Sequence, residues 1–300
     1  MSLKGRWANV HNIGKGIIWL GLMGIMTMAV LLLYVLSASF FPIDPHSLTS
    51  LTVLQGCQAV CSFLLPALLV AYLCYEQPWQ WLHIDRHPAW QTTLAAIILM
   101  LVALPAVNLL AEWNSHLHLP AFLAPVEAMM QEMEQRAARL TEQLLSTQTF
   151  GGMMVNMLIL AILPALTEEL TFRGVLLNLF TAYDQHRPLR RHLAIWAVAV
   201  IFSAMHGQFY GFIPRMLLGA LFGYMLWWTG SLWTAVWMHL TNNAAAVLSG
   251  FLSVRQGIPF NTIETLGTGS TEWIGWSSLC LAMVIIIIGR TGIFLNGNNG

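Results

Sequence analysis

The sequence predicts an all-α fold: a bundle of about eight membrane-crossing helices with one amphipathic helix beside it. Of the 300 residues, 57% are hydrophobic and only 9% are charged, whereas about 25% of the residues in a soluble domain are charged. Several apolar runs reach the ~20 residues that a helix needs to cross a ~30 Å hydrocarbon layer. We therefore expect an integral, multi-pass protein in contact with the lipid bilayer. The formal net charge is zero, which gives no electrostatic support for nucleic-acid binding.

Eight apolar segments are predicted to span the membrane. They are residues 17–41, 52–75, 90–112, 150–181, 192–212, 214–229, 231–252 and 272–290. The first follows Lys4, Arg6 and Lys15 as a signal peptide would, but its apolar run exceeds the 7–15 residues of a signal segment. We interpret it as a retained helix. Because no internal repeat or long linker divides the sequence, we expect a single membrane domain over residues 1–300.

The distribution of Lys and Arg predicts the orientation, because cytoplasmic loops are enriched in these residues. If the N-terminus is cytoplasmic, eight basic residues lie on the inner side and four on the outer side. The inner set is Lys4, Arg6, Lys15, Arg86, Arg187, Arg190, Arg191 and Arg290, and the outer set is Arg136, Arg139, Arg215 and Arg255. Both termini are therefore expected in the cytoplasm. If one predicted span does not cross the membrane, the orientation of all spans after it is inverted.

Residues 125–146 form a different kind of helix. Apolar residues recur at spacings of three and four, which makes one apolar stripe on an otherwise charged helix. Glu132 and Arg136 are spaced for an i, i+4 ion pair. The segment is too polar to span a membrane. We expect an amphipathic helix outside the membrane that lies at its interface or caps the bundle, and a substrate-gating lid is the alternative.

Three apolar segments carry polar side chains that a lipid-facing helix would not have. The segments read Glu168-Glu169-Leu170-Thr171-Phe172-Arg173, then Phe202-Ser203-Ala204-Met205-His206, then His239-Leu240-Thr241-Asn242-Asn243. A charged side chain at a helix centre costs roughly 2.5–3.5 kcal/mol on insertion scales, so such residues need partners and mark functional sites. Taken singly, each segment has a structural explanation, such as hydrogen bonds between helices. Taken together, they predict one shared polar cavity.

Spacing assigns the two acids to different tasks. Glu169 and Arg173 are four residues apart and can neutralise each other on one helix face. Glu168 points about 100° away and is left to find another partner. The imidazole and amide groups of the neighbouring spans are the partners that the sequence offers.

The order EExxxR, FxxxH, HxxxN, with each motif on a separate membrane helix, resembles the CPBP family of intramembrane proteases. That family comprises type II CAAX prenyl endopeptidases, bacteriocin-processing enzymes and lysostaphin-resistance-like (Abi) proteins. The motif residues are Glu168, Glu169, Arg173, Phe202, His206, His239 and Asn243. The resemblance covers about residues 150–252, a CPBP/Abi-like catalytic core. It implies hydrolysis of a peptide bond within a bacterial-type inner or plasma membrane.

Amide hydrolysis needs an activated water, donors for the oxyanion and a proton for the leaving amine. In the mechanism that we favour, Glu168 and His206 hold the water and Glu168 takes its proton. An apolar cavity destabilises a charged carboxylate and so makes it a better base. His239 and Asn243 donate to the oxyanion, while Glu169 and Arg173 support the helix.

A zinc enzyme is the alternative mechanism, with Glu168, His206 and His239 as the metal ligands. Two His and one Glu are a known catalytic zinc set. However, the HExxH spacing is absent, and neither His has in its own segment the carboxylate that usually orients a zinc ligand. We therefore expect a metal-free glutamate mechanism without a cofactor.

Two other functions remain open from the sequence. An ion- or proton-coupled transporter would also place Glu, Arg and His in the membrane, but the paired halves typical of transporters are not visible. A non-catalytic immunity or scaffold member of the same fold is the other alternative. The expected partner is a membrane protein, lipidated peptide or leader-type peptide as substrate.

Overall fold

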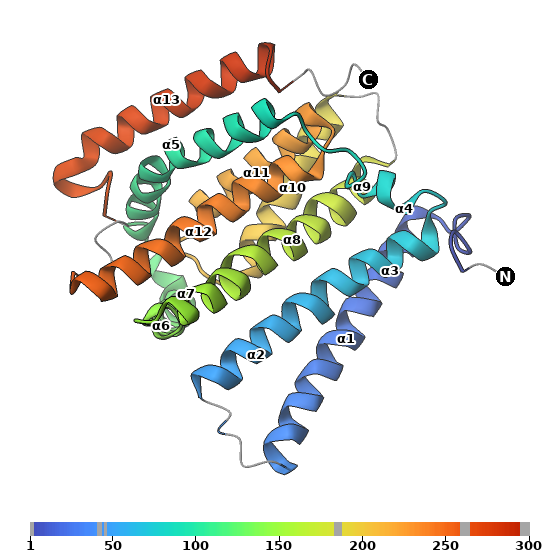
Figure 1. The fold of residues 1–300 in the computed structure, drawn as a ribbon, viewed down its shortest axis with the longest axis horizontal. Coiled ribbons are helices and arrows are strands. Elements are labelled where there is room, and N and C mark those ends of the chain that lie inside the picture. The colour runs from blue at the N-terminus through green and yellow to red at the C-terminus, as the bar shows by residue number, and fades with distance from the viewer. Residues whose placement is uncertain (1–2, 41–43, 45–46, 183–187, 259–264, 295–300) are drawn as a thin grey trace.

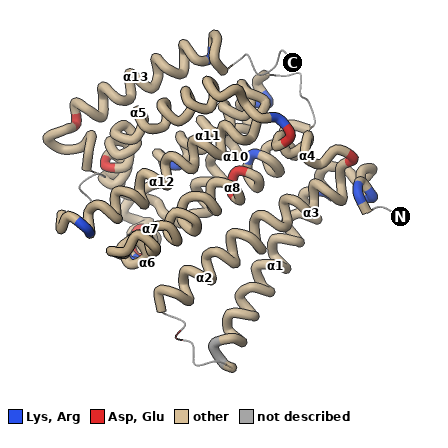
Figure 2. Tube along the Cα trace, in the orientation of Figure 1, with Lys and Arg blue, Asp and Glu red and all other residues tan. Residues whose placement is uncertain are grey.

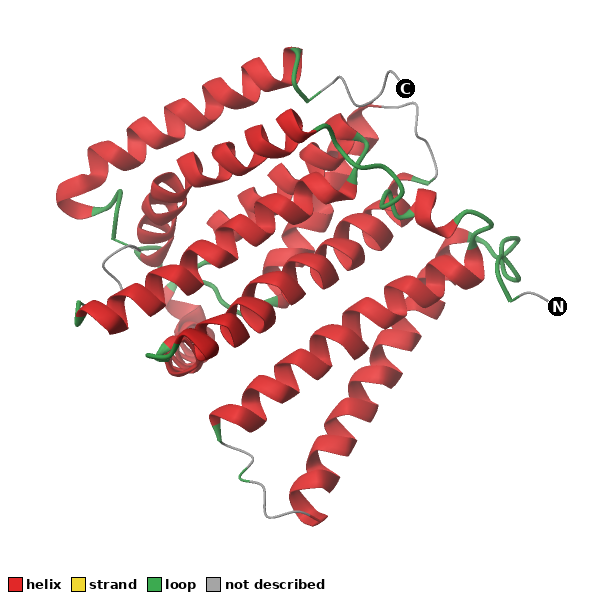
Figure 3. Cartoon of the chain, viewed as in Figure 1, coloured by secondary structure: helices red, strands yellow, loops and turns green. Residues whose placement is uncertain are grey.

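The computed structural model describes residues 3–40, 44, 47–182, 188–258 and 265–294. In these ranges the chain forms helices joined by short connections, without a strand (Figure 3). The helices pack side by side as a bundle, and the long helix that contains α8 runs through its middle (Figure 1). This arrangement confirms the all-α fold class.

The first three helices form a hairpin along one side of the bundle (Figure 1). They are α1 (Asn12–Phe40), α2 (Leu48–Gln58) and α3 (Leu65–Cys74), and a π-helical stretch, Ala59–Leu64, joins the last two. The Ser47 side chain begins α2 by accepting a hydrogen bond from the N–H of Ser50 at 3.2 Å, as an N-cap residue does. Trp19 of α1 is buried in the largest apolar core cluster together with α3 residues. The first apolar segment is therefore packed onto the bundle.

The opposite side of the bundle is formed by α5 (Trp90–Ser115) and α13 (Glu272–Thr291), which lie side by side. The short helix α4 (Pro78–Trp81) precedes α5. Pro105 interrupts the hydrogen-bond ladder inside α5 because proline lacks an N–H. Ser278 of α13 accepts a hydrogen bond from the neighbouring Ala106 N–H at 3.1 Å. A side chain from a distant helix thus bonds to the backbone beside the proline.

The middle of the bundle contains the helices that carry the three motifs. One continuous helix consists of α7 (Phe150–Asn156), a π-helical stretch (Met157–Ile162), α8 (Leu163–Glu169), a second π-helical stretch (Leu170–Leu176) and α9 (Leu177–Thr181). The others are α10 (Pro188–Met205), α11 (Phe212–Thr229) and α12 (Leu232–Gln256). Gly230, with φ +67°, ends α11 in the left-handed conformation, which glycine adopts at low cost. The chain then turns directly into α12.

The predicted amphipathic helix is present as α6 (Ala124–Leu145). In its apolar stripe Val126, Met133 and Leu140 are exposed, and only Leu144 and Leu145 at the end of the helix are buried. The helix contacts α2, α7 and α12 and also bonds to the segment between α10 and α11. The Gln131 amide donates to the Tyr210 hydroxyl at 3.0 Å, and the Tyr210 N–H donates to Glu134 at 3.3 Å. An exposed apolar stripe on a charged helix is typical of an interfacial position.

The predicted number of eight membrane spans is not confirmed. Among the described residues, five helical segments are long and apolar enough to cross a membrane: Asn12–Ser37, Leu48–Cys74, Trp90–Ser115, Phe150–Thr181 and Gly269–Thr291. The remaining three predicted spans correspond to α10, α11 and α12, which carry polar residues along their length. Figure 2 shows that charged residues are sparse; apart from those along α6 and those of α8 inside the bundle, they lie mainly near helix ends. The chain is a polytopic membrane protein with at least these five apolar helices.

Candidate active site

The acidic pair lies where the central helix changes its winding. Glu168 and Glu169 are the last residues of α8, and Arg173 lies in the π-helical stretch that follows. In that stretch the Leu177 N–H bonds to the Phe172 carbonyl, five residues back. Such wide turns are rare and occur frequently at functional sites.

Glu169 and Arg173 form the ion pair that their spacing predicted. Nη1 of Arg173 lies 2.8 Å from Oε1 of Glu169, and both side chains are fully buried. Nη2 of Arg173 donates to the Gly219 carbonyl of α11 at 3.0 Å. The guanidinium also lies 4.5 Å from the centre of the Phe202 ring, within the range of a cation–π interaction. The pair therefore joins three helices as well as neutralising its own charges.

His239 is held by Glu169, a contact that the sequence did not predict. Its Nδ1 lies 2.8 Å from Oε1 of Glu169, and because a carboxylate only accepts, Nδ1 carries the hydrogen. The ring is buried and stacks on Phe222 with 5.5 Å between centres. Nε2 of the same ring lies 3.9 Å from Oε2 of Glu168. Glu169 thus orients the imidazole, and the other ring nitrogen is turned toward the second acid.

Glu168 carries a buried oxygen without a hydrogen bond. Its side chain is 22% exposed, yet its Oε2 is buried and has no hydrogen-bond partner in the described part of the chain. The distance of 3.9 Å to His239 exceeds a direct hydrogen bond and is short enough for one water to bond to both groups. The two adjacent acids therefore have different environments.

His206 lies at the end of its helix, and the prediction that it sits inside a span is wrong. The span predicted over 192–212 ends at Met205, because Gly207 takes a left-handed φ of +64° and the chain turns. Nδ1 of His206 lies 2.8 Å from the Phe202 carbonyl, so it must be the donor and leaves Nε2 as an acceptor in the neutral ring. The side chain is exposed. It lies at the mouth of the cavity described below.

Asn243 is already engaged by the protein. Its Nδ2 donates to the Leu160 carbonyl at 3.2 Å, and its Oδ1 accepts from Nδ2 of Asn242 at 3.1 Å. One amide hydrogen of Asn243 remains after the bond to Leu160. Asn242, which was not singled out from the sequence, therefore positions the motif residue.

The predicted site residues from three helices line one cavity. It has a volume of about 370 Å³, and its lining includes Glu168, Phe202, His206, Arg215, His239 and Asn243. Glu169 and Arg173 lie behind this wall and do not line it. The structure therefore brings the three motifs together, as their polar residues predicted, and their chemical roles remain to be tested.

Arg215 is the residue that sequence reasoning missed. It was counted only among the outer basic residues, although it lies one turn into α11 and lines the cavity. Nη2 donates to the Gln208 side chain at 2.7 Å, whereas Nη1 is buried and bonds to nothing in the described residues. An arginine at the start of an apolar span was the available signal.

A metal does not fit the site as it is arranged. Within the described residues, no group of three or more His, Cys, Asp or Glu side chains could hold a metal ion. The orienting carboxylate expected for a zinc-binding imidazole is nevertheless present, because Glu169 of α8 supplies it to His239. The sequence argument against zinc, that neither His has an orienting carboxylate in its own segment, therefore does not hold for the folded chain. The observation that bears on zinc is the absence of three grouped ligands among the described residues.

The comparison with protein families matches this part of the chain. Residues 150–245 match the family model described as Type II CAAX prenyl endopeptidase Rce1-like. The segment is Rce1-like. It spans α7 to the middle of α12 and so contains all three motifs and the cavity's polar residues, which confirms the predicted resemblance. The flanking helices α1 to α6 and α13 lie outside the Rce1-like segment. No match was found among curated proteins or among solved structures.

Proposed function

We propose that the protein is an intramembrane endopeptidase in which Glu168 is the general base. The Rce1-like match implies CAAX-type endopeptidase activity. The chain also has several apolar helices that are long enough to place such an enzyme in a membrane. The observation that carries the assignment of the base is the buried, unbonded Oε2 of Glu168 at the wall of the cavity. The substrate class is a peptide bond in a membrane-associated protein or in a lipidated or leader-type peptide.

The geometry supports a route for the attacking water. The Glu168 carboxylate and Nε2 of His206 are both hydrogen-bond acceptors that line the cavity. A water bonded to both gives them its two hydrogens, which leaves a lone pair of its oxygen for the scissile carbonyl carbon. As the C–O bond forms, one proton passes to Glu168. The same carboxyl group then protonates the leaving nitrogen as the C–N bond breaks.

Three groups can stabilise the oxyanion. His239 donates from Nε2 only when its ring is protonated, because Nδ1 already donates to Glu169, and that carboxylate stabilises the imidazolium. Asn243 contributes its remaining amide hydrogen. Nη1 of Arg215 is a buried cationic donor in the same cavity. One such donor typically contributes ~2.7–4 kcal/mol to the transition state.

The Glu168→Gln variant tests the assigned base. The amide keeps the shape of the side chain but cannot take a proton, so the variant should fold, insert into the membrane and lose turnover. The measurement compares new peptide termini in membranes from cells that express the wild type or the variant. Glu142→Gln removes an equivalent charge from the exposed face of α6 and should leave the termini unchanged. Wild-type cleavage by Glu168→Gln would show that this residue is not the base.

Metal content tests the choice between mechanisms. We propose a reaction that needs no metal, so purified protein should hold far less than one zinc per chain and should keep its activity after chelation. Elemental analysis and peptide cleavage are measured on the same preparation. Stoichiometric zinc together with loss of activity on chelation would overturn the glutamate mechanism.

A further inference from the structure

A second cavity lies at the other end of the bundle. It has a volume of about 310 Å³ and is lined by the loop after α4, the end of α9, the start of α10 and the end of α11. The candidate active site is instead lined by residues beyond the end of α10 and at the start of α11. Because α10 and α11 are antiparallel neighbours, the two cavities occupy opposite ends of this helix pair. No motif residue lines the second cavity.

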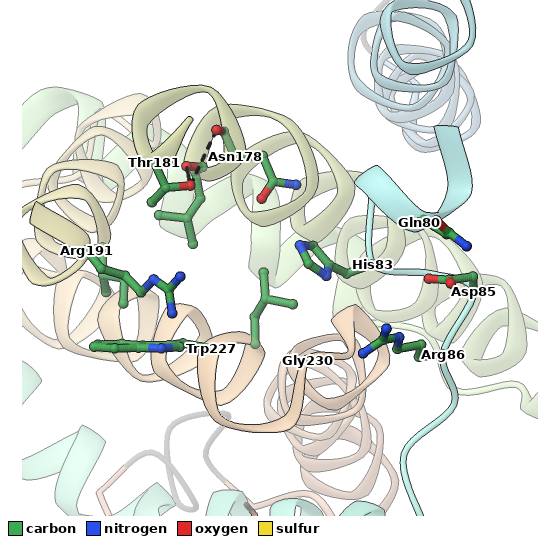
Figure 4. A pocket seen from close by; sticks show the side chains of 12 residues that line it. Gln80, His83, Asp85, Arg86, Asn178, Thr181, Arg191, Trp227 and Gly230 are labelled. Atoms are coloured by element: carbon green, nitrogen blue, oxygen red, sulfur yellow. Dashed lines mark hydrogen bonds between the residues drawn. The ribbon is translucent and has the colours of Figure 1, made fainter. Parts of the chain in front are cut away.

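Two arginines face this cavity from opposite sides. Figure 4 shows the guanidinium of Arg191 on one side above Trp227, that of Arg86 on the other side, and the ring of His83 between them. The Arg191 guanidinium lies 4.9 Å from the centre of the Trp227 ring. Asp85 is the only acid among the described residues of the lining. With His83 neutral, two arginines and one aspartate give these described residues a formal charge of +1.

The imidazole of His83 is fixed by an unusual backbone. His83 has φ +57° and is the only residue other than glycine with a positive φ in the described chain. Its N–H donates to the Gln80 carbonyl and its carbonyl accepts from the Leu232 N–H, at 3.0 and 2.9 Å. Burial lowers the pKa of His83, and a hydrogen bond with Asn178 opposes this shift. Strained backbone at a cavity wall is an observation from which a binding role can be inferred.

An apolar groove adjoins the polar cavity. It has a volume of about 620 Å³, lies between α10, α11 and α13, and shares Trp227 with the first cavity. Tyr224 and Trp228 stack in its wall, and the Arg290 guanidinium lies 5.9 Å from the Trp228 ring centre. Trp and Tyr with basic residues at helix ends are typical of the level of lipid headgroups. Basic pockets between membrane helices bind the phosphates of lipid headgroups.

We propose that the cavity binds the phosphodiester of a glycerophospholipid headgroup between Arg86 and Arg191, with an acyl chain of that lipid in the adjoining groove. A phosphodiester carries one negative charge and neutralises the +1 lining. Guanidinium groups suit it because their paired N–H groups match phosphate oxygens. The site is separate from peptide hydrolysis, so its test does not depend on activity.

The test is native mass spectrometry of the full-length protein in a non-ionic detergent. Phosphatidylglycerol should bind at one preferred site, whereas diacylglycerol with the same chains, which lacks the phosphate, should not. Each lost guanidinium should weaken binding about fivefold, so the double variant Arg86→Gln/Arg191→Gln should weaken it about twenty-five-fold. Arg139→Gln, an exposed position on α6, removes the same charge elsewhere and should change nothing.

Asp85→Asn gives a test of opposite sign. Asp85 is exposed, so the substitution should not affect folding, which is checked by gel filtration and thermal unfolding. It raises the formal charge of the lining to +2 and should strengthen phosphatidylglycerol binding about fivefold. Equal binding of both lipids, or no gain with Asp85→Asn, would overturn the proposal. Displacement of the lipid by an equimolar amount of soluble glycerol phosphate would overturn the lipid as the occupant, and its failure to displace supports it.

Discussion

Two Glu–Arg pairs in this protein have the same sequence spacing and opposite surroundings. Glu169 and Arg173 are 2.8 Å apart, and neither side chain is exposed. Glu132 and Arg136 on α6 are 2.6 Å apart, with side chains 61% and 70% exposed. Periodicity predicted both contacts equally well. The pairs differ in their other partners. The buried pair also contacts His239 and the Gly219 carbonyl, whereas the α6 pair has no other hydrogen bond or ion pair with the described residues.

Physical surroundings therefore decide the importance of each pair. Breaking a buried pair leaves an uncompensated charge and typically costs 3–5 kcal/mol, while an exposed i, i+4 pair contributes about 0.3–0.5 kcal/mol. Substitutions in and around the two pairs test this difference.

The largest effect is expected for Arg173→Gln. It leaves the Glu169 carboxylate buried without its guanidinium partner and removes the link to α11. We expect a loss of roughly 3–5 kcal/mol in the free energy of unfolding, measured by chemical unfolding in detergent. If the loss is as small as that for Arg136→Gln, the buried pair does not contribute more to stability than the exposed pair.

Glu169→Gln should have the next largest effect on stability and a strong effect on activity. Arg173 keeps its hydrogen bond to the Gly219 carbonyl and its contact with the Phe202 ring, and the amide oxygen still accepts one hydrogen bond, so we expect a smaller stability loss of about 1–3 kcal/mol. The imidazolium of His239 loses its counter-charge, so its stabilisation of the oxyanion weakens and turnover should fall about 10²–10³-fold. Peptide cleavage and unfolding are compared in the same preparation. Unchanged turnover in a folded variant would show that Glu169 has only a packing role.

Gly219→Ala tests the close approach that the buried pair requires. An added Cβ would lie 3.2 Å from both Arg173 Nη2 and Phe202 Cδ1 and 3.3 Å from Ala199 Cα. We expect a stability loss of about 1–3 kcal/mol from overpacking, seen as a lower thermal midpoint. Gly24→Ala is the matched control, because nothing lies within 4 Å of its added carbon. A loss of the same size in both would mean that crowding at Gly219 is not the cause.

Arg136→Gln should have the smallest effect. The exposed pair contributes about 0.3–0.5 kcal/mol, so the thermal midpoint should change little and turnover should not change. A large loss of activity would instead indicate that α6 acts on the site through its surface, for example as the lid that the sequence left open.

The sequence predicted local relationships better than those between helices. Helical spacing gave the Glu169–Arg173 pair, and the three polar segments predicted their common cavity. Spacing along one helix carries no information on contacts between residues 70 positions apart, so the bond from Glu169 to His239 was missed. The span predicted from hydropathy extended past Met205, because the single turn at Gly207 hardly changes the mean hydropathy of the segment. Arg215 stands at the second residue of the predicted span 214–229 and was counted among the outer basic residues, because a count of charges carries no information on the cavity that a side chain lines.

The wide turn at Leu170–Leu176 has a consequence for the whole central helix. Relative to an uninterrupted α-helix, one additional residue in a turn offsets everything after it by about 100°. Glu168 and Glu169 precede this offset, and Asn178 and Thr181, which line the second cavity, follow it. A single backbone irregularity thus sets the relative rotation of two binding sites. Removing one residue from this stretch would turn one site away from its cavity even if every side chain were kept.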